Sequence, residues 1–265
     1  MPTTRQYTFD IDTKRYLNRV NTYRSLNGLP NITNGDAVDI DNFIIGLKDL
    51  GLWHKSTFWI MNSNYNVGAG SIVLPIGGWF KYDAPITNNA TWSLSGIYHG
   101  GTSGGVTIRN VPSINNFSIF GCCNALLSNP NPFYMFAGIS KNYRPMVQNS
   151  GQTGTNRLLI FDSANVSIGV NDNSVTNYQS AFRIFQGNFS PSSIVRYDNS
   201  SLRTISRTND ATDTCDYVVG GSVFNNLNFG ATIFTPIFGL VTGFNTPVLF
   251  NLYKATIGKN LNLGI

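Results

Sequence analysis

The chain contains no glutamate: all 13 of its acidic residues are aspartates. This absence excludes several mechanisms at once. Jelly-roll glucanases use a pair of glutamates, zincin proteases need a glutamate base beside their histidines, and EF-hands close their calcium loop on a bidentate glutamate. The sequence therefore offers no residue for any of these three kinds of site.

Histidine and cysteine are also scarce. His54 and His99 are the only histidines, and neither lies in the sequence context of a catalytic triad. The three cysteines, Cys122, Cys123 and Cys215, fit neither a disulfide framework nor the spacing of a zinc or haem site. The first residues lack the apolar stretch of a signal peptide. We therefore predict a reduced, non-enzymatic protein that is made in the cytoplasm.

Charge is low as well, since charged residues make up only 12% of the chain and the formal net charge is +5. The 18 lysines and arginines form no run, so the sequence predicts no nucleic-acid-binding stripe. The densest basic region, formed by Lys14, Arg15, Arg19 and Arg24, is predicted to be the solvated face of a helix. An uncharged stretch near the C-terminus is interrupted by prolines, glycines and an asparagine, which argues against a membrane span.

Residues that favour strands and turns are abundant. Hydrophobic residues reach 42% and aromatic residues 13%, and 26 glycines together with many asparagines supply turns. A chain of 265 residues with this composition commonly folds as one domain. We expect a mainly β, antiparallel jelly-roll sandwich over residues 56–244. An extended segment and two helices over 1–55 precede it, and a helix and tail over 245–265 follow.

Periodicity supports this division. The first helix is expected to be capped by Asp12 or Thr13 and to stop at Gly28, and the second runs from about residue 34 to Gly51. After residue 53 the period changes from helical to two. The predicted strands are 56–62, 71–75, 79–82, 91–94, 105–108, 116–123, 133–140, 158–162, 165–170, 179–186, 194–197, 203–207, 217–221 and 231–238. A last helix is expected after Asn245 or Thr246.

Three stretches of the sequence carry a family resemblance. Residues 41–53 read as a helix leading into Gly-Leu-Trp, residues 77–105 contain tryptophan and glycine-rich segments, and residues 217–255 form the third stretch. They resemble the concanavalin A-like, laminin-G-like sandwich proteins encoded among phage tail, fibre and other virion genes. Ser103 and Gly105 depart from the usual form of the glycine-rich turn. The resemblance implies a virion component that is often oligomeric and sometimes binds sugars, and it transfers no catalytic residue.

Sugar binding on such a fold needs an exposed aromatic ring beside polar groups that form hydrogen bonds with the hydroxyl groups of the sugar. The candidates are Trp79, Trp92, Tyr98, His99 and Tyr143. Aromatic residues are equally typical of a core, and the sequence leaves that alternative open for each of them.

Calcium is the one metal that the sequence could hold, because it needs only oxygen ligands. Asp172, Asp213 and Asp216 are the candidate ligands. Their surroundings also fit solvated turns, since aspartate and asparagine tolerate left-handed conformations. No other cofactor is expected.

We therefore expect a structural protein of a phage virion, in the form of a fibre, decoration or tail-associated module. It would act through contacts with other virion proteins and form a homo-oligomer, with a trimer as the first guess. One alternative is an adhesin that binds a host surface glycan on the same fold. A second is a polysaccharide depolymerase, which would have to use aspartates in place of glutamates.

Overall fold

The computed structural model describes residues 7–87, 89–99, 104–112, 117–125, 215–220, 233–243, 248–261 and 263, and the backbone of seven strands between residues 133 and 206. The helices are α1 (Ile11–Leu26), α2 (Asn34–Asp49), the 3-10 turn η1 (Trp53–Lys55) and α3 (Val248–Ala255). The strands are β1 (Ser56–Ile60), β2 (Ile72–Val73), β3 (Pro75–Gly77), β4 (Ala84–Thr87), β5 (Ile97–Tyr98), β6 (Gly105–Val111), β7 (Phe117–Ala125), β8 (Phe133–Ile139), β9 (Tyr143–Ser150), β10 (Thr155–Asp162), β11 (Ser167–Asp172), β12 (Arg183–Phe189), β13 (Ser193–Asp198), β14 (Ser201–Ser206), β15 (Cys215–Val219) and β16 (Ile233–Thr242).

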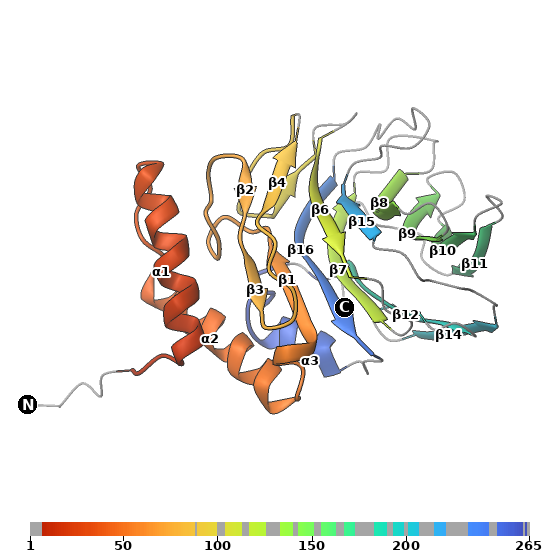
Figure 1. Ribbon diagram of the computed structural model, residues 1–265, viewed down its shortest axis with the longest axis horizontal. Helices are drawn as coiled ribbons and strands as arrows, with labels where there is room; N and C mark the ends of the chain where they lie inside the picture. The colour runs from red at the N-terminus through yellow and green to blue at the C-terminus, as the bar shows by residue number, and fades with distance from the viewer. Residues whose placement is uncertain are drawn as a thin grey trace, which may run out of the picture.

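The strands form two antiparallel sheets of eight strands each. The first has the order β14-β13-β12-β7-β16-β1-β3, with β5 also paired to β16, and the second has the order β11-β10-β9-β8-β15-β6-β4-β2. Tyr217 of β15 and Phe238 of β16 join the sheets, with ring centroids 5.8 Å apart. Figure 1 shows the three helices gathered on the side of the molecule that carries β1 and β3. The architecture is the predicted β-sandwich with helices packed on it.

Each of the first two helices begins at a side-chain cap. The carboxylate of Asp10 accepts a hydrogen bond of 2.9 Å from the Asp12 N–H, and the hydroxyl of Thr33 accepts one of 3.2 Å from the Asp36 N–H. These caps satisfy N–H groups that have no partner inside the helix. The expectation of a cap at Asp12 or Thr13 is wrong by at least two residues, because Asp10 takes that position and leaves the Asp12 carboxylate free for an ion pair.

The three central strands of the first sheet, β1, β7 and β16, are buried on both faces. On the face toward the helices, Phe58, Phe120 and Ile237 pack with apolar residues of α2 and α3. On the other face, Trp59 and Phe238 lie inside the sandwich with ring centroids 6.1 Å apart. A strand that is covered on both faces reads as a nearly continuous apolar run, which explains why β1 and β16 lack a clear alternation of apolar and polar residues.

A glycine sets the distance between the helices and this sheet. Phe58 of β1 and Phe120 of β7 both pair with Gly239 of β16, from opposite sides. The Phe58 ring lies over Gly239, where a Cβ atom would overlap it, and it comes within 6.1 Å of the Phe120 ring centroid. Phe43 of α2 packs edge-on against Phe58 at 5.3 Å, and Tyr253 of α3 does so against Phe120 at 5.6 Å. Each such pair contributes about 0.5–1.5 kcal/mol beyond the burial of its area.

The helix α3 docks by its apolar face. Leu249, Phe250 and Tyr253 are buried there, and Gly46 of α2 has no side chain where the Leu252 methyl groups approach. The cap expected for this helix, at Asn245 or Thr246, lies outside the described residues. In the part of the chain that the structure describes, no helix has the length and apolar character that crossing a membrane requires.

A buried arginine ties α1 to the segment between β1 and β2. The Arg24 guanidinium donates hydrogen bonds to the carbonyls of Pro30, Ser63 and Asn66 at 2.6, 2.7 and 3.0 Å. Asn66 is itself fully buried, and its amide makes four hydrogen bonds to backbone groups of Ile60, Val67 and Leu74. The prediction of a solvated basic face is therefore wrong for Arg24, because its charge replaces water for three carbonyls.

Two of the predicted strands are not strands. Residues 79–82 form an irregular segment, because side chains of β1 rather than a neighbouring strand bind its backbone. The Thr57 hydroxyl accepts a hydrogen bond from the Phe80 N–H and donates one to the Phe80 carbonyl. The Trp59 indole donates a hydrogen bond of 2.8 Å to the Tyr82 carbonyl. Residues 91–94 form only isolated bridges. Conversely, β9 is a strand that the sequence did not predict. Its proline and polar residues concealed the pattern.

We predict that Gly239→Ala destabilises the fold by about 1–3 kcal/mol, the usual effect of overpacking a closed core. The added methyl group would displace the Phe58 ring, which is held between Phe43 and Phe120. Urea unfolding measures the loss.

Gly35→Ala is the matched control, since a Cβ atom at Gly35 meets only the Thr33 hydroxyl at 4.0 Å. Alanine favours the helix there, so stability should change by less than about 1 kcal/mol. Equal stability of the Gly239→Ala variant and the unsubstituted protein would contradict the role assigned to Gly239.

Candidate functional site

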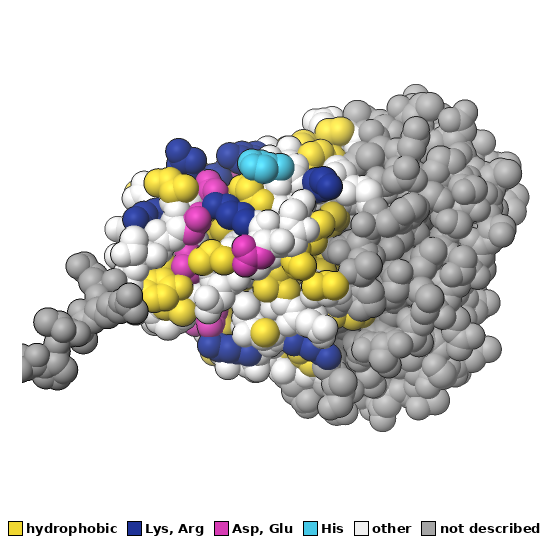
Figure 2. Space-filling model, turned by 90° about the horizontal axis from the view of Figure 1, so that it is seen from below, with side chains coloured by type: hydrophobic (Ala, Val, Ile, Leu, Met, Phe, Trp, Pro, Cys, Tyr) yellow, Lys and Arg dark blue, Asp and Glu magenta, His cyan; other side chains and the backbone are white. Residues whose placement is uncertain are grey.

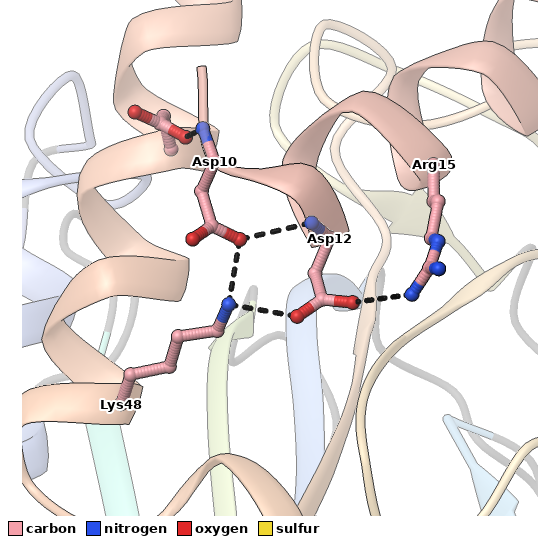
Figure 3. A network of polar contacts seen from close by, with 5 residues as sticks. Asp10, Asp12, Arg15 and Lys48 are labelled. Atoms are coloured by element: carbon pink, nitrogen blue, oxygen red, sulfur yellow. Dashed lines mark hydrogen bonds and ion pairs between the residues drawn. The ribbon is translucent and has the colours of Figure 1, made fainter. Parts of the chain in front are cut away.

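A network of charges joins the start of α1 to the end of α2. The Lys48 ammonium lies 2.6 Å from Asp10 Oδ1 and 2.7 Å from Asp12 Oδ2, and Arg15 approaches Asp12 Oδ1 at 3.4 Å. Figure 3 shows Lys48 reaching between the two aspartates, with Arg15 on the other side of Asp12. The placement suits both helices, because carboxylates stabilise a helix N-terminus and a cation stabilises a C-terminus. Two positive and two negative charges therefore balance within this network.

The network shifts the pKa values of Asp10 and Lys48. The hydrogen bond from Lys48 holds the pKa of Asp10 below its usual value, although partial burial opposes this. Burial by itself would lower the pKa of Lys48, but the hydrogen bonds to Asp10 and Asp12 outweigh it and the pKa is raised. Both shifts favour the charged forms, so the ion pairs are intact at neutral pH.

A pocket of about 380 Å³ opens beside this network. Its lining combines Asp12 of α1, Lys48 and Gly51 at the end of α2, and Trp53 and His54 of η1. Lys48 lies 5.3 Å from the Trp53 ring centroid, within the range of a cation–π contact. Figure 2 shows basic, acidic and hydrophobic side chains interleaved over the helical part of the molecule. The pocket thus brings together a carboxylate, an ammonium and an imidazole beside Trp53, which is only 9% exposed.

An aromatic segment lies beside the pocket. The Gly78 N–H donates to the Trp53 carbonyl at 2.8 Å, and the Trp79 N–H donates to the Ser56 carbonyl at 3.3 Å. The rings of Trp79 and Phe80 lie 5.9 Å apart, and those of Phe80 and Tyr82 stack at 6.2 Å with an angle of 6°. All three side chains are half-buried, so each keeps part of its ring at the surface.

The structure divides the predicted sugar-binding residues between the two ends of β1. Trp79 lies at the Ser56 end, next to the pocket. Trp92 and Tyr98 lie at the opposite end, where the Trp92 indole donates to the Gly70 carbonyl at 3.2 Å and the Tyr98 ring packs on Phe234 at 5.4 Å. Tyr143 begins β9, and its side chain lies outside the described residues. The predicted residues therefore do not form one platform.

His99 lies in the interior, with only 1% of its surface exposed. Its Nε2 atom is 3.0 Å from the Thr235 hydroxyl. Gly220, at a backbone φ of +74°, faces the ring so closely that a Cβ atom there would overlap it. Burial lowers the pKa of His99 to about 3, so the imidazole is neutral in the folded protein. In this position the ring packs in the interior against Thr235 and Gly220 and is not open to a ligand.

The candidate calcium ligands are described only in part. Asp216 accepts a hydrogen bond of 2.7 Å from the Asn110 N–H, and Asn110 has the left-handed φ of 56°. Asp172 ends β11, where only the backbone is described, and Asp213 lies outside the described residues. Among the described side chains, no three histidines, cysteines or aspartates gather as a metal site would require.

The groups that line the pocket match the hydrogen-bonding groups of a polyhydroxylated ligand. A carboxylate accepts hydrogen bonds from hydroxyl groups, an ammonium donates them, and an aromatic ring packs against the C–H face of a sugar. The sequence analysis did not identify Asp12, Lys48, Trp53 or His54 as site residues. The sequence does show a pair of aspartates, Asp10 and Asp12, at the start of one helix and Lys48 at the end of the next. Only the packing of α1 on α2 brings these three residues together.

No protein-family model matches the chain, and no curated protein sequence matches it either. Among solved structures, the binding domain of botulinum neurotoxin serotype D is similar with a TM-score of 0.60 at 11% identity, covering 77% of this chain and 52% of that one. A structure of botulinum neurotoxin type C, described by the dependence of its cell entry on two ganglioside molecules, gives 0.53 at 12% identity over 77% and 53%. The binding domain of botulinum neurotoxin DC in complex with SialylT gives 0.52 at 12% identity over 69% and 50%.

The chain thus spans about half the length of these neurotoxin chains. At such low identity the likeness shows the fold alone. It confirms the predicted concanavalin A-like, lectin-type jelly-roll sandwich.

We predict that folding stability falls as the pH drops below the ordinary His pKa of 6.5. The folded state keeps His99 neutral down to about pH 3, whereas the unfolded chain binds the proton near 6.5, so acid favours unfolding between these values. Between pH 7 and pH 5 this linkage costs about 2 kcal/mol. Urea unfolding at the two pH values measures it.

His99→Gln keeps a polar side chain of similar size without a titrating group, and its stability should be nearly equal at pH 7 and pH 5. Retention of the full pH dependence in that variant would show that another group is responsible.

Proposed function

We propose that this chain is a carbohydrate-binding module of a phage virion, and that the pocket between α1, α2 and η1 is where the saccharide binds. The single observation that carries the proposal is the lining of the pocket. Asp12, Lys48 and His54 supply hydrogen-bonding groups that a sugar requires, beside the small exposed part of Trp53, in a concavity of about 380 Å³. Trp79 lies on the adjoining segment and keeps part of its ring at the surface, so we propose that it supplies the aromatic platform.

Two further observations support this proposal. The similar neurotoxin binding domains include one in complex with SialylT and one described by its interaction with gangliosides, so glycan recognition occurs in proteins that contain this fold. The chain also lacks the glutamates on which jelly-roll glucanases rely. We therefore propose that it binds its saccharide without cleaving it, which favours an adhesin over a depolymerase.

The virion context rests on the resemblance of residues 41–53, 77–105 and 217–255 to phage sandwich proteins. In that setting the module contacts other virion proteins, and binding a host surface glycan would contribute to attachment. A homo-oligomer suits this role, because several weak sugar sites that act together bind a cell surface far more strongly than one site.

We predict that Trp79→Ala weakens glycan binding at least about tenfold, whereas Tyr98→Ala changes it less than about twofold. Both are half-buried aromatic residues, but only Trp79 lies at the pocket end of β1. A glycan array identifies the ligand, and calorimetric titration with the unsubstituted protein and both variants measures the affinities.

His54→Ala tests the pocket itself, since this exposed side chain makes no hydrogen bond or ion pair within the described part of the chain. It should weaken binding without lowering thermal stability. If Tyr98→Ala abolishes binding while His54→Ala and Trp79→Ala do not, the sugar binds at the other end of β1. Absence of binding to every glycan on the array contradicts the proposal.

We predict that purified particles of the phage that encodes this chain contain it, and that the isolated protein forms a trimer of its 29.1 kDa subunit. Mass spectrometry of the particle proteins and light scattering in solution provide the two measurements. A preparation of intact, infective particles that lacks the chain would contradict the virion assignment, while leaving sugar binding to its own test.

A further inference from the structure

His54 lines the pocket, and Lys55 and Lys81 lie on the two segments beside it; we call these three basic residues, none of which has a partner in the described part of the chain, the rim. His54 and Lys55 belong to η1, and Lys81 lies between Phe80 and Tyr82 in the aromatic segment. All three are exposed, and within the described part of the chain their side chains make no ion pair or hydrogen bond. Other basic residues nearby are paired: Arg19 binds Asp83 at 2.7 Å, as Lys48 and Arg15 bind Asp12.

These rim residues come from two adjoining segments. The hydrogen bonds from Gly78 to Trp53 and from Trp79 to Ser56 hold the aromatic segment against η1. A Cβ atom at Gly78 would lie 2.9 Å from His54 Nδ1, so the imidazole is in direct contact with the start of that segment. Each of the two adjoining segments therefore carries a lysine, Lys55 on η1 and Lys81 on the aromatic segment.

The charge balance differs between the floor and the rim of the pocket. At the floor, Asp12 and Lys48 line the pocket, and their charges are balanced within the network that they form with Asp10 and Arg15. At the rim, the only nearby carboxylate in this part of the structure without a partner is Asp49, which is exposed at the end of α2, against two lysines and a histidine. A neutral floor suits hydroxyl groups, and a basic rim suits an anion.

We infer that the saccharide bound here is acidic: its hydroxyl groups enter the pocket, and a carboxylate or sulfate group lies at the rim against His54, Lys55 and Lys81. This inference rests on the proposed sugar-binding function and adds the chemical class of the ligand. Exposed ammonium groups attract anions through interactions that salt screens over about 8–10 Å at physiological ionic strength, so the preference depends on salt concentration.

The test compares three tetrasaccharides by calorimetric titration: a neutral one from chitin, one from hyaluronan that carries carboxylates, and one from heparin that also carries sulfates. At low salt, the acidic ligands should bind at least about tenfold more tightly than the neutral one, and their affinity should fall several-fold between 25 and about 250 mM salt. The two acidic ligands distinguish a carboxylate from a sulfate as the preferred group.

Lys55→Gln combined with Lys81→Gln should remove most of the preference for acidic ligands and leave binding of the neutral ligand within about twofold. The matched control is Lys14→Gln combined with Lys254→Gln, which removes the same charge on α1 and α3. Thermal unfolding checks that both double variants fold. An equal loss in the control would show that net charge, and not this rim, attracts the ligand, and would overturn the inference.

The outcomes separate this inference from the proposed function. Binding of the neutral and acidic ligands with equal affinity, or without dependence on salt, overturns the acidic specificity and leaves sugar binding intact. Failure of all saccharides to bind overturns both.

Discussion

The rest of this structure depends on the contact between Phe58 and Phe120 across Gly239. Three central strands meet at this point, and the missing side chain of Gly239 admits the Phe58 ring to the surface of the sheet. Phe43 of α2 and Tyr253 of α3 then pack against the two phenylalanines. Because this layer closes the second face of the sheet, the helices are part of the sandwich core and not appendages. The position of α2 in turn fixes Lys48 and η1, and with them the pocket.

Buried polar side chains also stabilise the fold, because they form hydrogen bonds with backbone groups. Arg24 bonds the carbonyls of Ser63 and Asn66 in the segment between β1 and β2, and the Asn66 amide bonds the carbonyls of Ile60 in β1 and Leu74 after β2. Thr57 and Trp59 do the same for residues 79–82 with side chains that point into the sandwich. Buried backbone groups without such partners would each cost about 1–3 kcal/mol. The aromatic segment beside the pocket is therefore held in place by side chains of β1, which gives a loop the rigidity that a binding surface needs.

Only part of the candidate site could be predicted from the sequence. Trp79 could be proposed from its type and neighbours, since an aromatic residue in a loop of a lectin-type fold is a reasonable platform. Asp12, Lys48 and Trp53 could not, because they lie on three elements and only tertiary packing brings them together. His99 looked equally suitable as a residue beside glycines in the sequence, but its ring is buried, and the space for it is left by Gly220, which lies far away in the chain. The sequence contains the same signal, histidine next to glycine, for an exposed ligand and for a buried one.

The sequence by itself determined the fold class. Short apolar segments of period two, separated by glycine and asparagine turns and flanked by segments of helical period, have few arrangements other than a sandwich with helices packed on it. It also determined that no glutamate chemistry is available. Only the tertiary structure decided which aromatic residues face solvent, which arginine is buried, and which charges remain unpaired. Local sequence patterns specify periodicity and turns, whereas burial and pairing arise from contacts between residues far apart in the chain, such as Lys48 with Asp10 and His99 with Thr235.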